Sequence, residues 1–300
     1  MDLQSLMNGR LGVGLALGVG RSLPPGVGYL LASFFADRIA ARRDSALVRA
    51  VRANQWVLSG GSFSAKQLDQ AVRQTFRNTA HCLFDLYHNL HNPDAALKLM
   101  EQNPQLDEAI QRSMAEKKGL VVVGVHMSNF DFVFQSAALR GWRGLALSYP
   151  QPGGGYQWQN ELRRETGIEI IPGSMDALRK AIRRLQAGEM VITGIDRPQV
   201  DSKYCPRFFG RPATMPVLHI LLALKTNAPV VVTAAIMRPD GIYQFFASDF
   251  IAMQPHSDRH TEIMLNAERV LSVAEGFIRQ APQQWAMFYP VWPEALEEMP

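Results

Sequence analysis

Short apolar runs alternate with helical patterns in the second half of the chain, and this rhythm constrains the fold most. Residues 120–125 form a continuous apolar run, typical of a strand buried on both faces. The patterns then alternate as helix 129–140, strand 144–148, helix 157–166, strand 168–171, helix 174–187, strand 190–195, helix 216–225, strand 229–237 and strand 242–247. Because crossover helices join parallel strands, this order predicts an α/β fold with a single mixed, mostly parallel sheet flanked by helices.

The first half of the chain is helical by its spacing. Residues 45–58 predict one helix, and Ser64 begins a second, longer helix whose apolar residues recur at helical spacing. No repeat of fixed period and no low-complexity linker interrupts the chain. We therefore expect one continuous domain, with N-terminal helices over residues 1–60 and the α/β part over residues 61–300.

The N-terminal segment predicts association with a membrane surface. The stretch 11–36 carries a single charge, Arg21, and glycines and prolines divide it into halves shorter than the roughly 17–25 residues of a membrane-spanning helix. No signal-peptide pattern accompanies it, so secretion is disfavoured. A basic cluster that favours an anionic cytoplasmic leaflet follows at once: Arg38, Arg42, Arg43, Arg49 and Arg52. The alternative is a pair of core helices with a solvated basic face.

Composition narrows the class of partner. Hydrophobic residues make up 47% of the chain and charged residues 19%, which disfavours long disorder and coiled coils. Two cysteines, Cys82 and Cys205, lie far apart in the sequence, which excludes a disulfide scaffold and a thiolate zinc site. Of the 31 basic residues 24 are Arg, which suits a phosphate-bearing partner. A coding bias toward Arg is the alternative explanation.

The strongest chemical signal lies where the first apolar run ends. His126 follows this strand at the carboxyl edge, where open α/β sheets bind ligands, and Asp131 lies in the first turn of the next helix. A carboxylate on one ring nitrogen would orient the imidazole and leave the other nitrogen to accept a proton from a hydroxyl. We expect Ser128 to cap the helix.

The spacing between His126 and Asp131 is weak evidence by itself. Seven histidines and 27 acids in 300 residues predict about 0.6 such pairs by chance. The context raises the signal, because His126 is the only histidine with an acid five residues later, and it follows a buried strand. A structural histidine remains the alternative.

Further stretches extend the pattern over nearly all of the chain. Asp196-Arg197, followed by the sequence FFGRPATMP at 208–216, is similar to a D-R … F-F-G-x-P block, and PQQW at 282–285 is similar to a closing P-E-Q-W signature. Together with His126 and Asp131, these stretches resemble the lysophospholipid acyltransferase superfamily. They most resemble its branch of lipid A acyltransferases and phosphatidylinositol mannoside acyltransferases.

The resemblance implies a glycerolipid-acyltransferase-like fold and acyl transfer from a thioester to a lipid hydroxyl. His126 would be the general base and Asp131 its orienting acid. Backbone N–H groups at the start of the helix after Met127 and the Arg197 side chain would stabilise the oxyanion. The resemblance and the Arg-rich composition suggest these substrate-binding residues: Arg197, Asp196, Ser128, Asn129, Arg164, Phe208, Phe209 and Arg211. The expected partners are acyl-CoA or acyl carrier protein as donor and a membrane lipid as acceptor, at the cytoplasmic face of the inner membrane. We expect no cofactor, metal or nucleic acid.

Three departures from the family pattern keep other readings open. Some relatives have an active-site Glu where this chain has Cys205, and Gln283 and Tyr289-Pro290 replace the Glu and the His-Arg of the closing signature. One alternative is an esterase or thioesterase that uses the same base with water. The other is a lipid-binding protein without catalysis, which would keep lipid binding when His126 is replaced.

Overall fold

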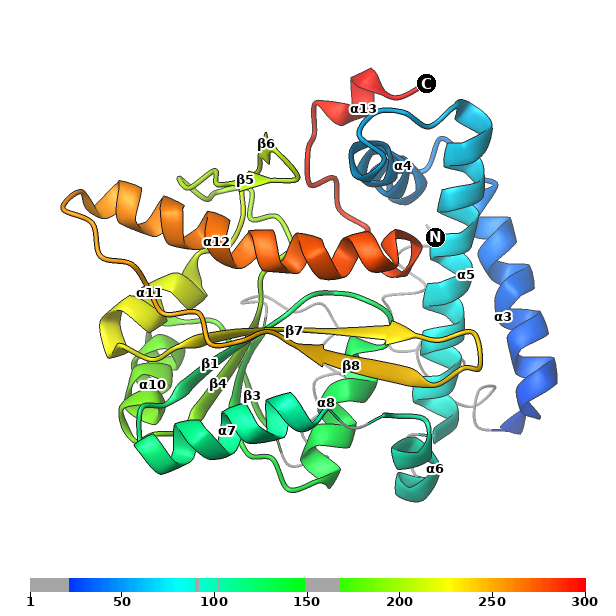
Figure 1. Cartoon of the computed structure of the whole chain (residues 1–300). Helices are drawn as coiled ribbons and strands as arrows, with labels where there is room; N and C mark the ends of the chain where they lie inside the picture. Colours follow the sequence, from blue (N-terminus) through cyan, green and yellow to red (C-terminus); the bar gives the residue numbers. More distant parts are fainter. Residues whose placement is uncertain (1–21, 90–91, 102, 149–167) are drawn as a thin grey trace.

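A central sheet with helices on both faces forms the body of the molecule (Figure 1). The computed structural model describes residues 22–89, 92–101, 103–148 and 168–300. The strands are β1 Leu120–Gly124, β2 Leu145–Ser148, β3 Glu169–Pro172, β4 Met190–Gly194, β5 Arg207–Phe208, β6 Arg211–Pro212, β7 Val230–Met237 and β8 Tyr243–Ala247. The helices are α3 Pro25–Ala40, α4 Ala46–Leu58, α5 Ala65–Asn89, α6 Pro93–Lys98, α7 Pro104–Glu116, α8 Phe130–Leu139, α10 Met175–Gln186, α11 Leu218–Thr226, α12 Arg259–Gln280 and α13 Ala295–Glu298, with a 3-10 turn at Pro282–Gln284.

The main sheet has the order β3-β2-β4-β1-β7-β8. Five of its strands are parallel, and β8 pairs antiparallel with β7 as the predicted hairpin. The prediction of a mixed, mostly parallel sheet flanked by helices is confirmed. The predicted helix 157–166, the segment 11–20 and Arg164 lie outside the described residues.

Two apolar clusters cover the two faces of the sheet. In β1, Val121 and Val123 pack with α10, α11 and α12 on one face, whereas Leu120 and Val122 pack with α8 and the end of α5 on the other. Strands buried on both faces read as continuous apolar runs, which is why residues 120–125 predict β1 correctly. The first cluster also includes Ala53 and Val57 of α4.

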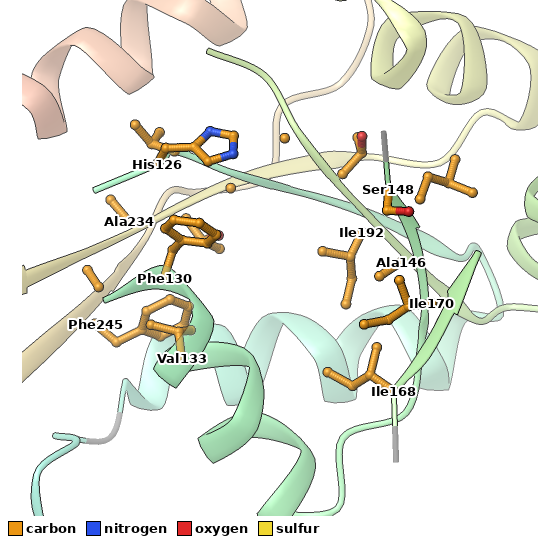
Figure 2. Close-up of a pocket in the computed structure, with 17 residues that line it drawn as sticks. His126, Phe130, Val133, Ala146, Ser148, Ile168, Ile170, Ile192, Ala234 and Phe245 are labelled. Atoms are coloured by element: carbon orange, nitrogen blue, oxygen red, sulfur yellow. The ribbon is translucent and has the colours of Figure 1, made fainter. Parts of the chain in front are cut away.

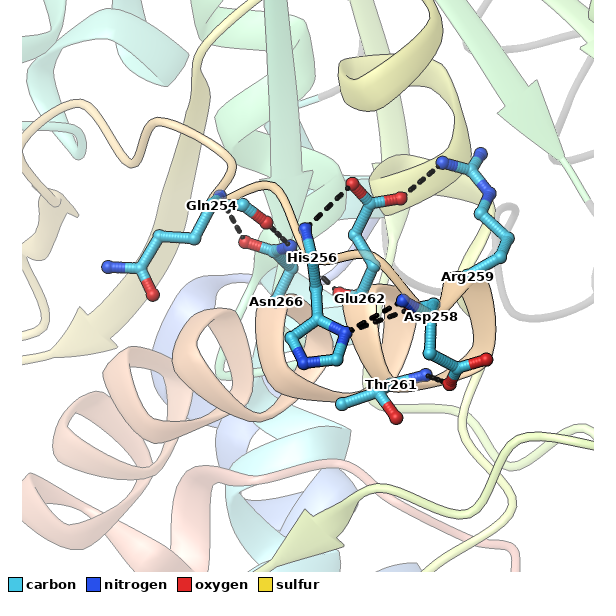
Figure 3. A network of polar contacts seen from close by, with 7 residues as sticks. All are labelled: Gln254, His256, Asp258, Arg259, Thr261, Glu262 and Asn266. Atoms are coloured by element: carbon cyan, nitrogen blue, oxygen red, sulfur yellow. Dashed lines mark hydrogen bonds and ion pairs between the residues drawn. The ribbon is translucent and has the colours of Figure 1, made fainter.

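Helix α12 is the largest element absent from the sequence prediction. Asp258 caps it by accepting a hydrogen bond from the Thr261 N–H at 2.8 Å. Asn266 joins the preceding loop to the helix, because its side chain accepts from the Gln254 N–H and donates to the Gln254 carbonyl, each at 2.8 Å (Figure 3). A polar network thus anchors the start of α12, and its apolar positions cover the sheet.

Helix α3 packs along α5 (Figure 1), and several of its polar side chains face α5. The Tyr29 hydroxyl donates to Asp85 at 2.5 Å, Ser33 Oγ lies 2.8 Å from His81 Nε2, and Asp37 accepts two bonds from Arg77 at 2.7 and 2.6 Å. Ala36 is buried against α5, but five larger apolar residues are 39% to 74% exposed: Val27, Leu30, Leu31, Phe34 and Phe35. The amphipathic pattern of α3 is therefore reversed relative to a helix that covers a core.

Several arginines of the predicted basic cluster make contacts within the protein. Arg52 is only 8% exposed, donates to Asp69 at 2.5 Å and reaches the Pro300 carbonyl at 2.8 Å. Arg43 also pairs with Asp69, and Arg49 pairs with Glu297 at 3.9 Å. The expectation of one free basic surface is therefore wrong for Arg52, which ties α4 to α5 and the chain end.

No helix within the four described ranges is both long and apolar enough to cross a bilayer.

Candidate active site

Strand register brings His126 and Asp196 together at one edge of the sheet. β1 and β4 are parallel neighbours with Gly124 opposite Gly194. His126 and Asp196 each lie two residues beyond these glycines, so both emerge at the carboxyl ends of adjacent strands.

Asp196 holds both the ring and the backbone of His126. Asp196 Oδ1 lies 2.5 Å from His126 Nδ1, and Asp196 Oδ2 accepts the His126 backbone N–H at 2.8 Å. The Trp285 indole N–H also donates to Oδ2, at 2.7 Å. Asp196 is fully buried, whereas the His126 side chain is 26% exposed. A carboxylate at Nδ1 places the proton there, so Nε2 is left as the basic atom.

The charges around His126 favour its protonated form. Burial alone would lower the pKa of His126, but the charge and hydrogen bond of Asp196, with the charge of Asp131, raise it above the usual histidine value. Arg197 acts in the opposite direction. Burial would raise the pKa of Asp196, yet His126 and Trp285 together hold it below the usual range. Asp196 can thus orient the imidazole of His126, as a carboxylate partner does for a histidine that acts as a general base.

The acid that hydrogen-bonds the His126 ring differs from the predicted one. Asp131 lies in the first turn of α8 and raises the pKa of His126 through its charge, while Asp196 provides the bond to Nδ1. The spacing in the sequence could not anticipate this, because the pairing of β1 with β4 determines which acid meets the ring. Asp131 also lies at the helix N-terminus, where a negative charge is favourable.

Two neighbours fix the position of the imidazole. The Phe130 ring meets it edge-on, with centroids 4.8 Å apart. On another side lies Gly194, where an added Cβ would be 3.0 Å from His126 Cε1. A side chain at position 194 would therefore crowd the ring.

An apolar cavity of about 100 Å³ opens beside His126 (Figure 2). It runs between α8 and the sheet, and its labelled lining residues are His126, Phe130, Val133, Ala146, Ser148, Ile168, Ile170, Ile192, Ala234 and Phe245. Most of this lining is apolar, and apolar cavities accept apolar groups. The imidazole thus borders a space suited to hydrocarbon.

The predicted residues Ser128 and Asn129 build the turn between β1 and α8. Asn129, not Ser128, caps α8, because its side chain accepts the Phe132 N–H at 3.3 Å. Ser128 has a φ of 49°, is 6% exposed and donates its N–H to the Gln284 carbonyl at 2.7 Å. The Met127 N–H is also bonded, to the Val125 carbonyl at 2.7 Å. Of the amides after Met127, that of Ser128 is therefore already bonded, and the expected oxyanion donors are those at the start of α8.

Phe208 and Phe209 form a tight turn instead of an open binding surface. Phe208 is fully buried and stacks on Trp292 with centroids 5.6 Å apart, so it supports the core and does not face a ligand. Phe209 has a φ of 50°, and its N–H donates to Glu275 at 2.6 Å. Arg211 pairs with Glu298 at 2.8 Å. The expected ligand contact of Phe208 is therefore corrected to a packing contact.

Arg197 lies next to the His126–Asp196 pair, whereas Cys205 is not part of this site. The Arg197 guanidinium donates to the Tyr289 hydroxyl at 2.7 Å and lies 4.2 Å from that ring. Cys205 is exposed, while Asp196 supplies the buried acid of the site. His126 therefore has a carboxylate partner even though position 205 carries no Glu.

The roles of Gly194 and Trp285 at this site are absent from the sequence prediction. Gly194 precedes the predicted Asp196-Arg197 pair, and Trp285 belongs to the PQQW stretch, so both lie in segments that the resemblance identified. Their contacts with His126 and Asp196 depend on tertiary packing, which no local pattern encodes.

A comparison with known protein families shows to which family the chain belongs. The family model described as bacterial lipid A biosynthesis acyltransferase matches residues 7–294, which include the whole site. No curated protein matches the chain in a sequence comparison. The resemblance drawn from the residues is thus confirmed, and the chain belongs to the bacterial lipid A biosynthesis acyltransferase family and is an acyltransferase.

Proposed function

We propose that this acyltransferase moves a fatty acyl chain from acyl-CoA or acyl carrier protein to a hydroxyl of a membrane glycolipid or lysolipid. It would work without a cofactor, at the cytoplasmic face of the inner membrane. The observation that carries the proposal is the Asp196–His126 pair beside an apolar cavity. This arrangement joins a base that can activate a hydroxyl to an apolar space that can take the first carbons of an acyl chain.

In the proposed reaction His126 acts as general base. Its Nε2 accepts the proton of the acceptor hydroxyl while the oxygen attacks the thioester carbonyl carbon. The tetrahedral intermediate collapses, the carbon–sulfur bond breaks, and the imidazolium returns the proton to the thiolate. Asp196, fixed at Nδ1, stabilises the imidazolium throughout. The products are the acylated lipid and free thiol.

Two positive groups near the base would stabilise the oxyanion. The first is the N-terminus of α8, which begins at Phe130, four residues after His126. The second is the Arg197 guanidinium, whose charge acts on His126.

The reversed amphipathic pattern of α3 supports peripheral membrane binding. Phe34 and Phe35 are 51% and 60% exposed, and the polar side of α3 is satisfied by α5. Burying such side chains is favourable by about 1.5–3 kcal/mol each. The Arg38 guanidinium lies 5.2 Å from the Phe34 ring centroid, so one cation lies beside the apolar face. That combination suits an interface of hydrocarbon and anionic headgroups.

An assay of thioester consumption tests the proposal. Purified protein, detergent-dispersed membrane lipid and acyl-CoA are incubated, and free thiol and lipid products are measured together. We expect acylated lipid to form in step with thiol, and acyl carrier protein to be used as donor if acyl-CoA is not. Thiol release with only free fatty acid would favour a hydrolase. No release with either donor would favour a lipid-binding protein.

A further inference from the structure

A segment near the C-terminus clamps the turn that carries His126. The Ser128 N–H donates to the Gln284 carbonyl at 2.7 Å, and the Ala286 N–H donates to the His126 carbonyl at 2.8 Å. Met127 and Trp285 form an antiparallel bridge between these bonds. Residues 284–286 thus pair like a short strand with residues 126–128.

This strand-like pairing places one polar side-chain atom, Trp285 Nε1, against the His126–Asp196 pair. The Trp285 Nε1–H donates to Asp196 Oδ2 at 2.7 Å, and the same oxygen accepts the His126 backbone N–H. With Oδ2 held by two donors, Oδ1 is directed to His126 Nδ1. The indole therefore completes the set of bonds that fixes the carboxylate.

Packing prevents the indole from moving away. Trp285 is 1% exposed and meets Phe208 edge-on at 6.0 Å between centroids, with Trp292 at 6.3 Å. Trp292 is equally buried, yet its Nε1 has no hydrogen-bond partner among the described residues. Two adjacent buried indoles thus differ in one respect: only Trp285 donates to the site.

We propose that Trp285 is a positioning residue for the acyl-transfer base, acting through Asp196. This inference rests on the proposed role of His126. The indole N–H keeps the buried Asp196 ionised and stops its rotation, so that Oδ1 stays on Nδ1 and Nε2 faces the reacting hydroxyl. The buried carboxylate needs such a donor, because an unpaired charge in the interior is costly.

Trp285→Phe tests the role, with Trp292→Phe as the matched control. Trp285→Phe removes the donor and keeps an aromatic ring, and we expect kcat to fall about tenfold or more with KM changed less than twofold. The acid limb of the pH–rate profile should move to higher pH, because a carboxylate with fewer donors is more basic and favours the imidazolium. Trp292→Phe should retain the wild-type kcat and pH profile.

An NMR titration of His126 separates this proposal from the proposed function. The pKa of His126 should rise in Trp285→Phe and stay unchanged in Trp292→Phe, whether or not His126 is the catalytic base. An unchanged pKa in Trp285→Phe, or equal losses of kcat in both variants, would overturn the role of Trp285. If Trp285→Phe fails to fold, Trp285→Leu removes the same donor, and an unchanged acid limb in that variant would also overturn the role of Trp285.

Discussion

Asp196 and Asp131 both act on His126, but through different forces. Asp196 hydrogen-bonds Nδ1 and is fully buried, whereas Asp131 contributes its charge from the first turn of α8. A hydrogen bond sets the tautomer and orientation of the ring, and a distant charge only shifts its proton affinity. The two acids should therefore differ in their effect on turnover.

Asp196→Asn should lower kcat at least about 100-fold, since an amide facing Nδ1 favours the wrong tautomer. Asp131→Asn should lower kcat less than about tenfold.

The wild-type rate should rise with pH through a midpoint above the usual histidine pKa, because the neutral ring is the base. Removing the charge of Asp196 should lower that midpoint. Steady-state rates across pH check both effects; a larger loss in Asp131→Asn than in Asp196→Asn would reject the assignment.

Gly194→Ala should disturb catalysis without unfolding the protein. The new Cβ would lie 3.0 Å from His126 Cε1, so the ring must shift by a few tenths of an ångström. We expect kcat to fall about tenfold, because a small misplacement of a catalytic group is expensive. Gly276→Ala is the control, since its Cβ meets no atom within 4 Å. Equal kcat in the two variants would contradict the role of Gly194.

His219 should make the protein sensitive to acid. It is 1% exposed, neither ring nitrogen has a partner among the described residues, and burial lowers its pKa to about 3. The unfolded chain binds a proton below about pH 6.5 and the native state does not, so stability falls as pH decreases. Between pH 7.5 and 4.5 this loss is about 2–3 kcal/mol.

His219→Leu should remove that loss. Urea unfolding at both pH values compares the variant with the wild type, and the carboxylates common to both proteins cancel in the difference. The wild type should lose about 2–3 kcal/mol more than the variant. Identical losses would mean that His219 finds a proton-accepting partner in the native state.

Among the elements, the sequence predicts where the strands lie better than it predicts which strands pair with each other. Residues 120–125 and 190–195 predict β1 and β4 because both are buried on two faces. Helix α12 is missed although Asp258 caps it and Ile263, Ala267 and Val270 recur at helical spacing. Strand order is not encoded locally, so the contact between His126 and Asp196 could not be predicted.

Helix α3 makes the membrane claim testable. Phe34→Ser with Phe35→Ser should weaken binding to anionic vesicles at least tenfold, because both rings are exposed on the side turned away from α5. The matched control is Val200→Ser with Leu265→Ser, which removes exposed apolar residues elsewhere. Vesicle co-sedimentation measures both. Equal binding of the two double variants would argue against α3 as the membrane-facing element.

At the scale of the whole molecule, distant segments assemble one site. β1 brings His126, β4 brings Asp196, and the chain after α12 brings Trp285. The sequence identified His126 correctly as the residue beside the cavity, since a strand end followed by a helix start is visible locally. The two side-chain hydrogen bonds of Asp196 to His126 and Trp285 join residues 70 and 89 positions apart, so only the fold reveals them.

The turnover of His126→Ala tests the central claim most directly. Acylated lipid and free thiol are measured at saturating donor and acceptor, with the folded state of the variant checked by its unfolding curve. We expect a loss of at least about 10²–10⁴-fold, the range for removal of a general base. Turnover like that of the wild type in a folded His126→Ala variant would contradict it.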